Sequence, residues 1–128
     1  MRDRLEQWLD GFALDVELRR QVAHVLSALP AGVRSDLVED PGFRVSDYEP
    51  GLGVMQVLVG LPGRRAPSRS VVLKRTLRRR PVAFVRWVIA HELAHAHLRN
   101  GGREPGEDPE FAADALASDW GFPPPHRA

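Results

Sequence analysis

The stretch from Val82 to Arg99 constrains the fold of this chain more than any other, because its apolar residues are spaced with the period of a helix. Phe84 and Val88 fall on one stripe of that helix, and the two histidines of residues 91–95, which read HELAH, fall on the same stripe. A proline precedes the stretch and an Asn-Gly pair follows it. The pattern predicts a helix over Val82–Arg99 that is buried nearly all round.

His91 and His95 are four residues apart, so on a helix they lie one above the other on the same face. Both imidazoles can therefore reach one metal ion. Glu92 is turned by about 100° from His91, which is where a base that deprotonates a metal-bound water has to lie. The segment is typical of a zinc hydrolase helix. By the same angular count His97 lies well away from the two histidines, and we expect it at the surface.

A catalytic zinc site normally has three protein ligands and leaves a fourth position for water. Because the chain contains no cysteine, the third ligand has to offer nitrogen or oxygen. Two histidines and a carboxylate favour zinc, although manganese, cobalt and iron accept the same ligands. Four carboxylates follow the histidines at plausible reach: Glu104, Glu107, Asp108 and Glu110.

Glu110 is the predicted third ligand. Asp108 suits a helix N-cap and Pro109 suits the first helical position, so Glu110 opens a helix and is held more rigidly than a side chain on the preceding loop. Asp114 lies on the same face of that helix, where it can accept a hydrogen bond from the free ring nitrogen of a ligating histidine. Asp114 and Glu107 remain the alternative ligands.

The HELAH segment and residues 110–114, which read EFAAD, together resemble the gluzincin metallopeptidases. In that family a glutamate on a second helix completes the site, and an acid four residues later orients the first histidine. The small size, with helices and strands before the motif helix, is most similar to the minimal gluzincins of the ImmA/IrrE type. The resemblance is specific over Val88–Asp114 and only architectural over residues 1–80. Members often carry asparagine at the position of Asp114, and the chain shows no separate DNA-binding helix pair.

The resemblance implies zinc-dependent hydrolysis of peptide bonds by a metal-activated water, with Glu92 as general base. It also implies that the strand over Ser70–Leu77 lies along the cleft and pairs with an extended peptide. The carbonyl oxygen of such a substrate usually needs a second electrophile. Tyr48, His126 and an arginine of the basic loop are the candidates for this transition-state stabiliser.

The remaining sequence predicts a small α+β, zincin-like domain. Helices are expected at Leu5–Phe12 and Leu18–Leu29, with a short helical turn over Val33–Asp40. Strands rich in β-branched residues are expected at Phe43–Val45, Gly53–Gly60 and Ser70–Leu77, with Tyr48 between the first two and a long loop over residues 61–68. We therefore expect one domain over residues 1–128, in which N-terminal helices, an about three-stranded sheet, a buried HExxH helix and a C-terminal glutamate helix follow one another.

The length and the composition of the chain are consistent with a single domain of this kind. At 128 residues the chain is of single-domain size, and 43% hydrophobic with 27% charged residues is typical of a globular protein. The N-terminus lacks the apolar segment of a signal peptide, and no apolar run approaches membrane-spanning length. We expect a cytoplasmic protein that acts on a peptide or protein and does not enter a membrane.

The stretch from Arg64 to Arg80 is strongly basic and contains no acid. It is a candidate footprint for nucleic acid or for an acidic partner. The alternative function is therefore a zinc-bound regulatory module that binds nucleic acid or protein, with little or no peptidase activity. Lys74 is the one lysine among 18 basic residues, so a general bias toward arginine also explains the cluster without any ligand.

Overall fold

The computed structural model describes residues 2–48, 69–99 and 108–125. In chain order these residues form α1 (Arg2–Leu9), α2 (Val16–Ala28), α3 (Ala31–Val38), β1 (Phe43–Tyr48), β2 (Arg69–Lys74), the 3-10 helix η2 (Arg75–Arg79), α5 (Val82–Leu98) and α6 (Pro109–Asp119). This described part confirms the predicted α+β class. The strand predicted over Gly53–Gly60, the loops after it and before α6, and His126 fall outside the described residues.

The sheet consists, within the described residues, of the parallel pair β1 and β2. Phe43 is opposite Arg69, and the register continues to Tyr48 opposite Lys74. Burial alternates along both strands, as it must when successive side chains point to opposite faces of a sheet. Val45 and Val71 are on the buried face. About three strands were expected, and the one predicted over Gly53–Gly60 lies outside the described residues.

Two boundaries of the predicted strands are wrong. Tyr48, expected between two strands, is the last residue of β1. The strand predicted over Ser70–Leu77 ends early, and the chain continues as η2. The turn forms because the Leu77 side chain is buried in the core and because Arg78 Nη1 lies 2.6 Å from Asp15 Oδ1 at the start of α2. Both contacts are distant in sequence, so a local β-propensity could not predict them.

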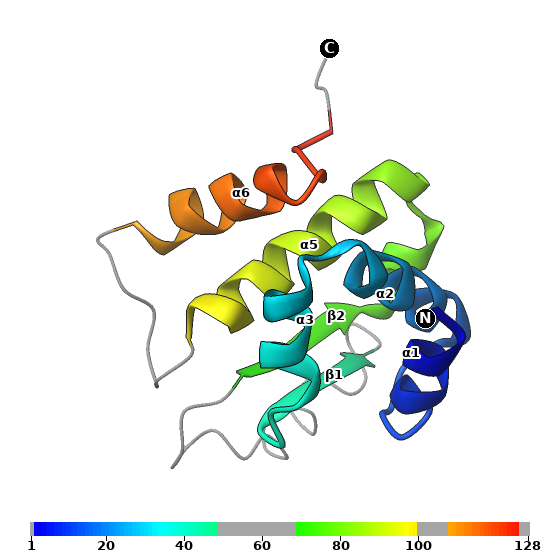
Figure 1. Cartoon of the computed structure of the whole chain (residues 1–128). Coiled ribbons are helices and arrows are strands. Elements are labelled where there is room, and N and C mark those ends of the chain that lie inside the picture. The colour runs from blue at the N-terminus through cyan, green and yellow to red at the C-terminus, as the bar shows by residue number, and fades with distance from the viewer. Residues whose placement is uncertain (1, 49–68, 100–107, 126–128) are drawn as a thin grey trace.

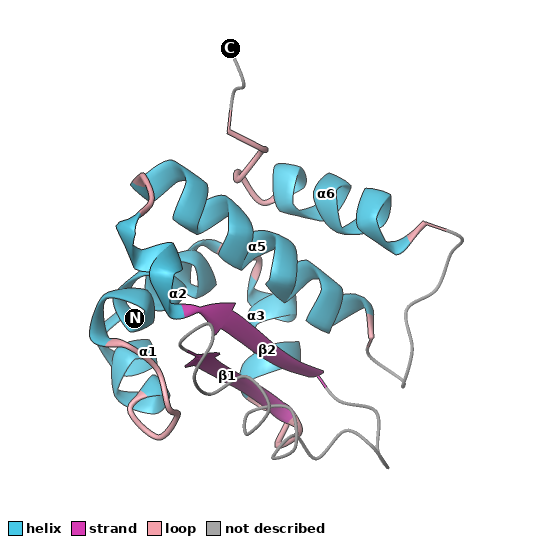
Figure 2. Ribbon diagram, turned by 180° about the vertical axis from the view of Figure 1, so that it is seen from behind, coloured by secondary structure: helices cyan, strands magenta, loops and turns pink. Residues whose placement is uncertain are grey.

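The helix α5 is the centre of the fold. It runs between α6 on one side and β2, α2 and α3 on the other (Figures 1 and 2). Its buried residues are Val85, Ile89, Ala90, Leu93, Ala94, His95 and Ala96. The helix is less enclosed than the burial nearly all round that its sequence predicts, because Phe84, Trp87 and Val88 are only partly buried and Val82 is exposed. Packing on both sides nevertheless holds its few polar side chains in fixed positions.

The N-terminal helices cover one side of this core, as predicted. The α2 helix begins at Asp15, whose side chain accepts hydrogen bonds from the backbone N–H groups of Glu17 (3.0 Å) and Leu18 (3.2 Å). Trp8 of α1 stacks on Phe43 with ring centroids 5.9 Å apart. Among the helices that the structure describes, none has the length and apolar character needed to cross a membrane.

Candidate metal centre

The helices α5 and α6 bring the predicted ligands together. His91 and His95 lie on the face of α5 that meets α6, and Glu110 lies in the first turn of α6. That turn begins as predicted, because the Asp108 side chain accepts a hydrogen bond from Phe111 N at 3.1 Å and Pro109 follows the cap. The α6 residues buried nearby are alanines, and such small side chains let the two helices approach closely. Glu110 therefore reaches both histidines.

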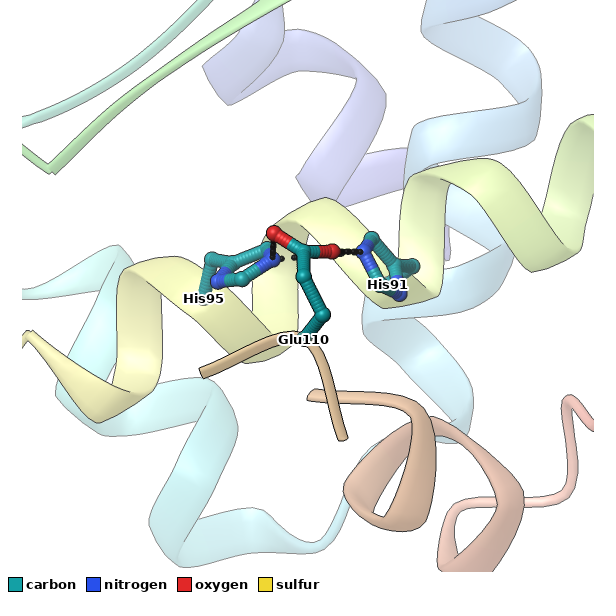
Figure 3. A group of neighbouring side chains, drawn as sticks. All are labelled: His91, His95 and Glu110. Atoms are coloured by element: carbon teal, nitrogen blue, oxygen red, sulfur yellow. Dashed lines mark hydrogen bonds and ion pairs between the residues drawn. The ribbon is translucent and has the colours of Figure 1, made fainter. Parts of the chain in front are cut away.

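His91, His95 and Glu110, which we call the triad, place their ligand atoms within 4.8 Å of one another. The Glu110 carboxylate lies between the two imidazoles (Figure 3). Its Oε1 is 2.9 Å from His91 Nε2, and its Oε2 is 3.2 Å from His95 Nε2. The two Nε2 atoms are 3.2 Å apart. The triad is thus a candidate metal site with two nitrogen ligands and one oxygen ligand.

Asp114 determines which nitrogen of His91 faces the triad. Its Oδ1 lies 2.8 Å from His91 Nδ1. A carboxylate accepts hydrogen bonds, so this contact places a proton on Nδ1 and turns Nε2 toward Glu110 and His95, which makes Nε2 the nitrogen that a metal would use. This is the contact expected for Asp114 from its i+4 position after Glu110. The imidazole is also held by Trp87, whose ring centroid lies 5.6 Å away.

The charge of Glu110 is stabilised by the histidines. Burial raises the pKa of its carboxyl group, but the hydrogen bonds from His91 and His95 outweigh that effect, so that the pKa lies below its usual value. Most of the Glu110 side chain is nevertheless exposed, at 72%, whereas only 9% of the His95 side chain is. The triad therefore has a buried imidazole floor and an anionic side open to solvent.

The donor set fits a divalent cation. Two imidazole nitrogens that face each other at 3.2 Å need either a shared proton or a positive ion between lone pairs. Imidazole and carboxylate are ligands that zinc takes readily, and the Asp114 contact supplies the outer hydrogen bond that ligating histidines commonly make. The same set also accepts manganese, cobalt or iron. The geometry therefore supports a metal site and leaves the identity of the metal open.

Glu92 lies beside the triad and lines a cavity of about 620 Å³. Phe84 and Val88 precede it at four-residue spacing along α5 and line the same cavity. Tyr48, the candidate transition-state stabiliser, also lines this cavity from the end of β1. The structure thus brings Glu92, the residue after His91, and Tyr48 to one hollow, and its volume is within the range of small-molecule sites.

A second polar cluster lies on the opposite face of α5 and was not predicted. The Arg69 guanidinium, at the start of β2, bonds Asp36 and, at 2.7 Å, Asp40, and its Nε donates to the Ala96 carbonyl at 2.8 Å. His97 Nδ1 lies 2.7 Å from Asp36 Oδ2. His97 is therefore half-buried and paired, and the expectation that it lies at the surface is wrong. We call Arg69, Asp36, Asp40 and His97 the Arg69 cluster.

The charges of the Arg69 cluster support one another. Burial raises the pKa of Asp36, but hydrogen bonds from Arg69 and His97 bring it below its usual value. The pKa of Asp40 is lowered chiefly by its hydrogen bond from Arg69. Burial lowers the pKa of Arg69, and its two carboxylate partners raise it above the usual value. Asp36 and Asp40 precede β1 while Arg69 follows it, and no periodicity in the sequence links them.

Several residues of the predicted basic stretch form internal salt bridges. Besides Arg69, Arg75 bonds Asp47 at 2.9 Å and Arg78 bonds Asp15 at 2.6 Å. These arginines fasten β2 and η2 to β1 and α2, which is a structural use of their charge. Arg64 and Arg65 lie outside the described residues.

Compared with protein-family models, curated proteins and solved structures, the chain matches none of them. The geometry of the triad and of the cavity lined by Glu92 is therefore the basis on which a function can be assigned.

Proposed function

We propose that this protein is a zinc-dependent metallopeptidase of the minimal gluzincin type, with a zincin-like domain over residues 1–128. One observation carries the proposal: the ligand atoms of His91, His95 and Glu110 converge within 4.8 Å, and Glu92, the residue after His91, lines a cavity. A purely structural zinc site is closed by four protein ligands and has no use for a base at an open position. A site with three ligands and an adjacent carboxylate is arranged for hydrolysis.

Each polar residue has a distinct task in this mechanism. His91, His95 and Glu110 would hold zinc, which when bound supplies Lewis-acid polarisation of the substrate carbonyl and a lowered pKa for water. Glu92 takes a proton from water and passes it to the leaving nitrogen. Asp114 keeps the His91 ring oriented through Nδ1. Tyr48, from the wall of the same cavity, is the residue we assign to stabilise the developing oxyanion.

The substrate in this proposal is a peptide or protein in extended conformation. β2 precedes α5 in the chain and packs against it. Its residues Val72 and Lys74 line the cavity that contains Glu92. A peptide added beside β2 would therefore pass the base.

The decisive experiment separates metal binding from turnover. The Glu92→Gln variant should keep one zinc per chain, because Glu92 is not in the triad, and should lose peptide cleavage by at least about a hundredfold. Zinc content is measured by elemental analysis, and cleavage by mass spectrometry of a peptide library. The Glu39→Gln variant serves as control, since it makes the same change at an acid that lines a different hollow, together with Trp8 and Phe12.

Two results would contradict the peptidase assignment. One is equal cleavage by the wild type and the Glu92→Gln variant. The other is stoichiometric zinc in the wild type with no cleavage of any library peptide, which would favour the alternative of a zinc-bound regulatory module. If the module binds nucleic acid, its affinity for nucleic acid should depend on the salt concentration and should fall when Arg78, Arg79 and Arg80 are replaced by alanine.

A further inference from the structure

The cavity beside Glu92 is apolar at its base and cationic at its rim. Its apolar lining comes from Val72 and Leu77 on one side and from Phe84 and Val88 of α5 on the other. Lys74, Arg79 and Arg80 also line it, and all three are exposed. Glu92 is the one acid in the described lining. The cavity thus combines an apolar recess with a rim of three positive charges.

The rim cations differ from the other basic residues of β2 and η2. Arg75 and Arg78 are paired with Asp47 and Asp15, and Arg69 is paired within its cluster. Lys74, Arg79 and Arg80 form no salt bridge with an acid among the residues that the structure describes. The Arg80 guanidinium instead lies 4.4 Å above the Phe84 ring, on the cavity wall. The unpaired charge of this region is therefore concentrated at the cavity.

From this separation we infer that the cavity selects peptides in which an apolar side chain is flanked by acidic residues. The apolar side chain would enter between Phe84, Val88 and Leu77, and the flanking carboxylates would meet the rim cations. Phe84, Val88 and Glu92 are each one helical turn apart on α5. A substrate side chain bound between Phe84 and Val88 would therefore place its neighbouring peptide bond beside Glu92. The inference rests on the proposed peptidase function for its last step, but the recognition itself does not require hydrolysis.

A binding experiment tests recognition without turnover. Three fluorescein-labelled peptides with the same central Leu-Phe pair, flanked by glutamates, glutamines or lysines, are titrated into the Glu92→Gln protein and followed by anisotropy. The glutamate peptide should bind about tenfold more tightly than the glutamine peptide, and the lysine peptide should bind most weakly. Raising the salt concentration should reduce the difference, because exposed charges are screened.

Variants identify the cations responsible. In the Glu92→Gln background, the pair Arg79→Ala and Arg80→Ala should reduce the preference for the glutamate peptide to about twofold or less. The matched control is Arg44→Ala, which removes an exposed arginine of β1 that borders a different hollow with Trp8 and Phe12. It should leave the preference unchanged. Both substitutions are at exposed positions, and thermal melting verifies that the variants are folded.

The outcomes separate this inference from the proposed function. Equal affinity for the glutamate and glutamine peptides, or an equal loss in the Arg44→Ala control, overturns the inference. If the zinc-loaded wild type cleaves all three peptides at the same rate, recognition of acids is refuted while the peptidase function stands. If the glutamate peptide is bound selectively through Arg79 and Arg80 but never cleaved, recognition stands and the peptidase function is wrong.

Discussion

The triad and the Arg69 cluster lie on different faces of the same helix and solve the problem of buried charge in different ways. His97 is turned by about 200° from His95 around α5: His95 meets Glu110 in the first turn of α6, while His97 pairs with Asp36 of α3 and packs against Trp120 at the far end of α6. In the Arg69 cluster the chain provides its own cation, and the guanidinium meets two carboxylates and a backbone carbonyl. In the triad two imidazoles and a carboxylate converge with no guanidinium or ammonium group among them.

A structural cluster and a functional site differ in how completely their polar groups are matched. Buried polar groups are stable when donors and acceptors match, and the Arg69 cluster achieves this match with protein groups alone. The triad is a set of lone-pair donors that a divalent ion would complete. Its Glu110 side chain is 72% exposed, whereas Arg69 is 6% exposed and bridges β2, α3 and α5. The face of α5 on which the triad lies, where donors and acceptors are not matched by protein groups alone, is therefore the face on which chemistry is expected.

The sharpest test of this distinction replaces one histidine from each face. We expect His95→Ala to weaken zinc binding by at least about a thousandfold, because one of three ligands is lost. His97→Ala, on the same helix, should leave zinc affinity within about threefold of the wild type. Zinc affinity is measured by competition with a chromophoric chelator. A similar loss in both variants would mean that the two clusters are not independent.

Replacement of Arg69 should break the other cluster. The Arg69→Met variant leaves Asp36 and Asp40 without their cation, so we expect the free energy of unfolding to fall by about 3 kcal/mol, the lower end of the range for buried pairs. The lower end applies because the Asp40 side chain remains 29% exposed. Denaturant unfolding measures the loss, and Arg44→Met should change stability by less than about 0.5 kcal/mol. Equal stability of the two variants would refute a structural role for Arg69.

Asp114 of α6 holds the His91 ring through Nδ1, and its replacement should reduce zinc affinity less than the loss of a ligand does. Asp114→Ala removes the acceptor at His91 Nδ1, and we expect zinc affinity to fall about 10- to 100-fold. Asp114→Asn retains an oxygen acceptor of the same size and should lose less than about fivefold. The same chelator competition measures both variants. A larger loss for asparagine than for alanine would contradict a role through the hydrogen bond to His91.

The smallest expected effect is the acid dependence of the Arg69 cluster. The folded-state pKa values of Asp36 and Asp40 are lowered, so their contribution to stability is fully present above the unfolded value of about 3.9 and is lost as the pH falls through the lower folded values. The difference in unfolding free energy between the wild type and Arg69→Met should therefore be constant above about pH 5 and shrink below about pH 4. Denaturant titrations across this range measure it, and a constant difference down to pH 2 would be contrary to the assignment.

Helical periodicity predicts the triad because all of its positions follow from local rules. The i, i+4 spacing of His91 and His95 fixes a shared face, and the Asp108-Pro109 pair fixes the start of α6 and with it the position of Glu110. The Asp114 contact follows from the same spacing. The packing of α6 on α5 is not a local feature. It was expected only because a catalytic zinc site needs a third protein ligand, which Glu110 of α6 could supply.

The features that the sequence does not predict depend on contacts between distant segments. Arg69 appears in a basic run and would be assigned to solvent, yet its partners Asp36 and Asp40 belong to α3 and the turn after it. β2 ends early because Arg75 forms a salt bridge with Asp47 and Arg78 forms one with Asp15. The parallel pairing of β1 with β2 is likewise a tertiary choice, since strand propensity gives no direction.

The third ligand comes from the end of a helix that is anchored at its other end. α6 packs through the buried Ala113 and Ala117, the partly buried Leu116 and the buried Trp120 at its C-cap, whereas the first turn, which carries Glu110, has no buried residue. An ion gripped by all three triad residues would act as a tether between the C-terminal helix and the middle of the molecule. Chelation would then loosen α6 before the remainder melts, and amide exchange in Pro109–Asp119 would report occupancy of the centre before any loss of global structure.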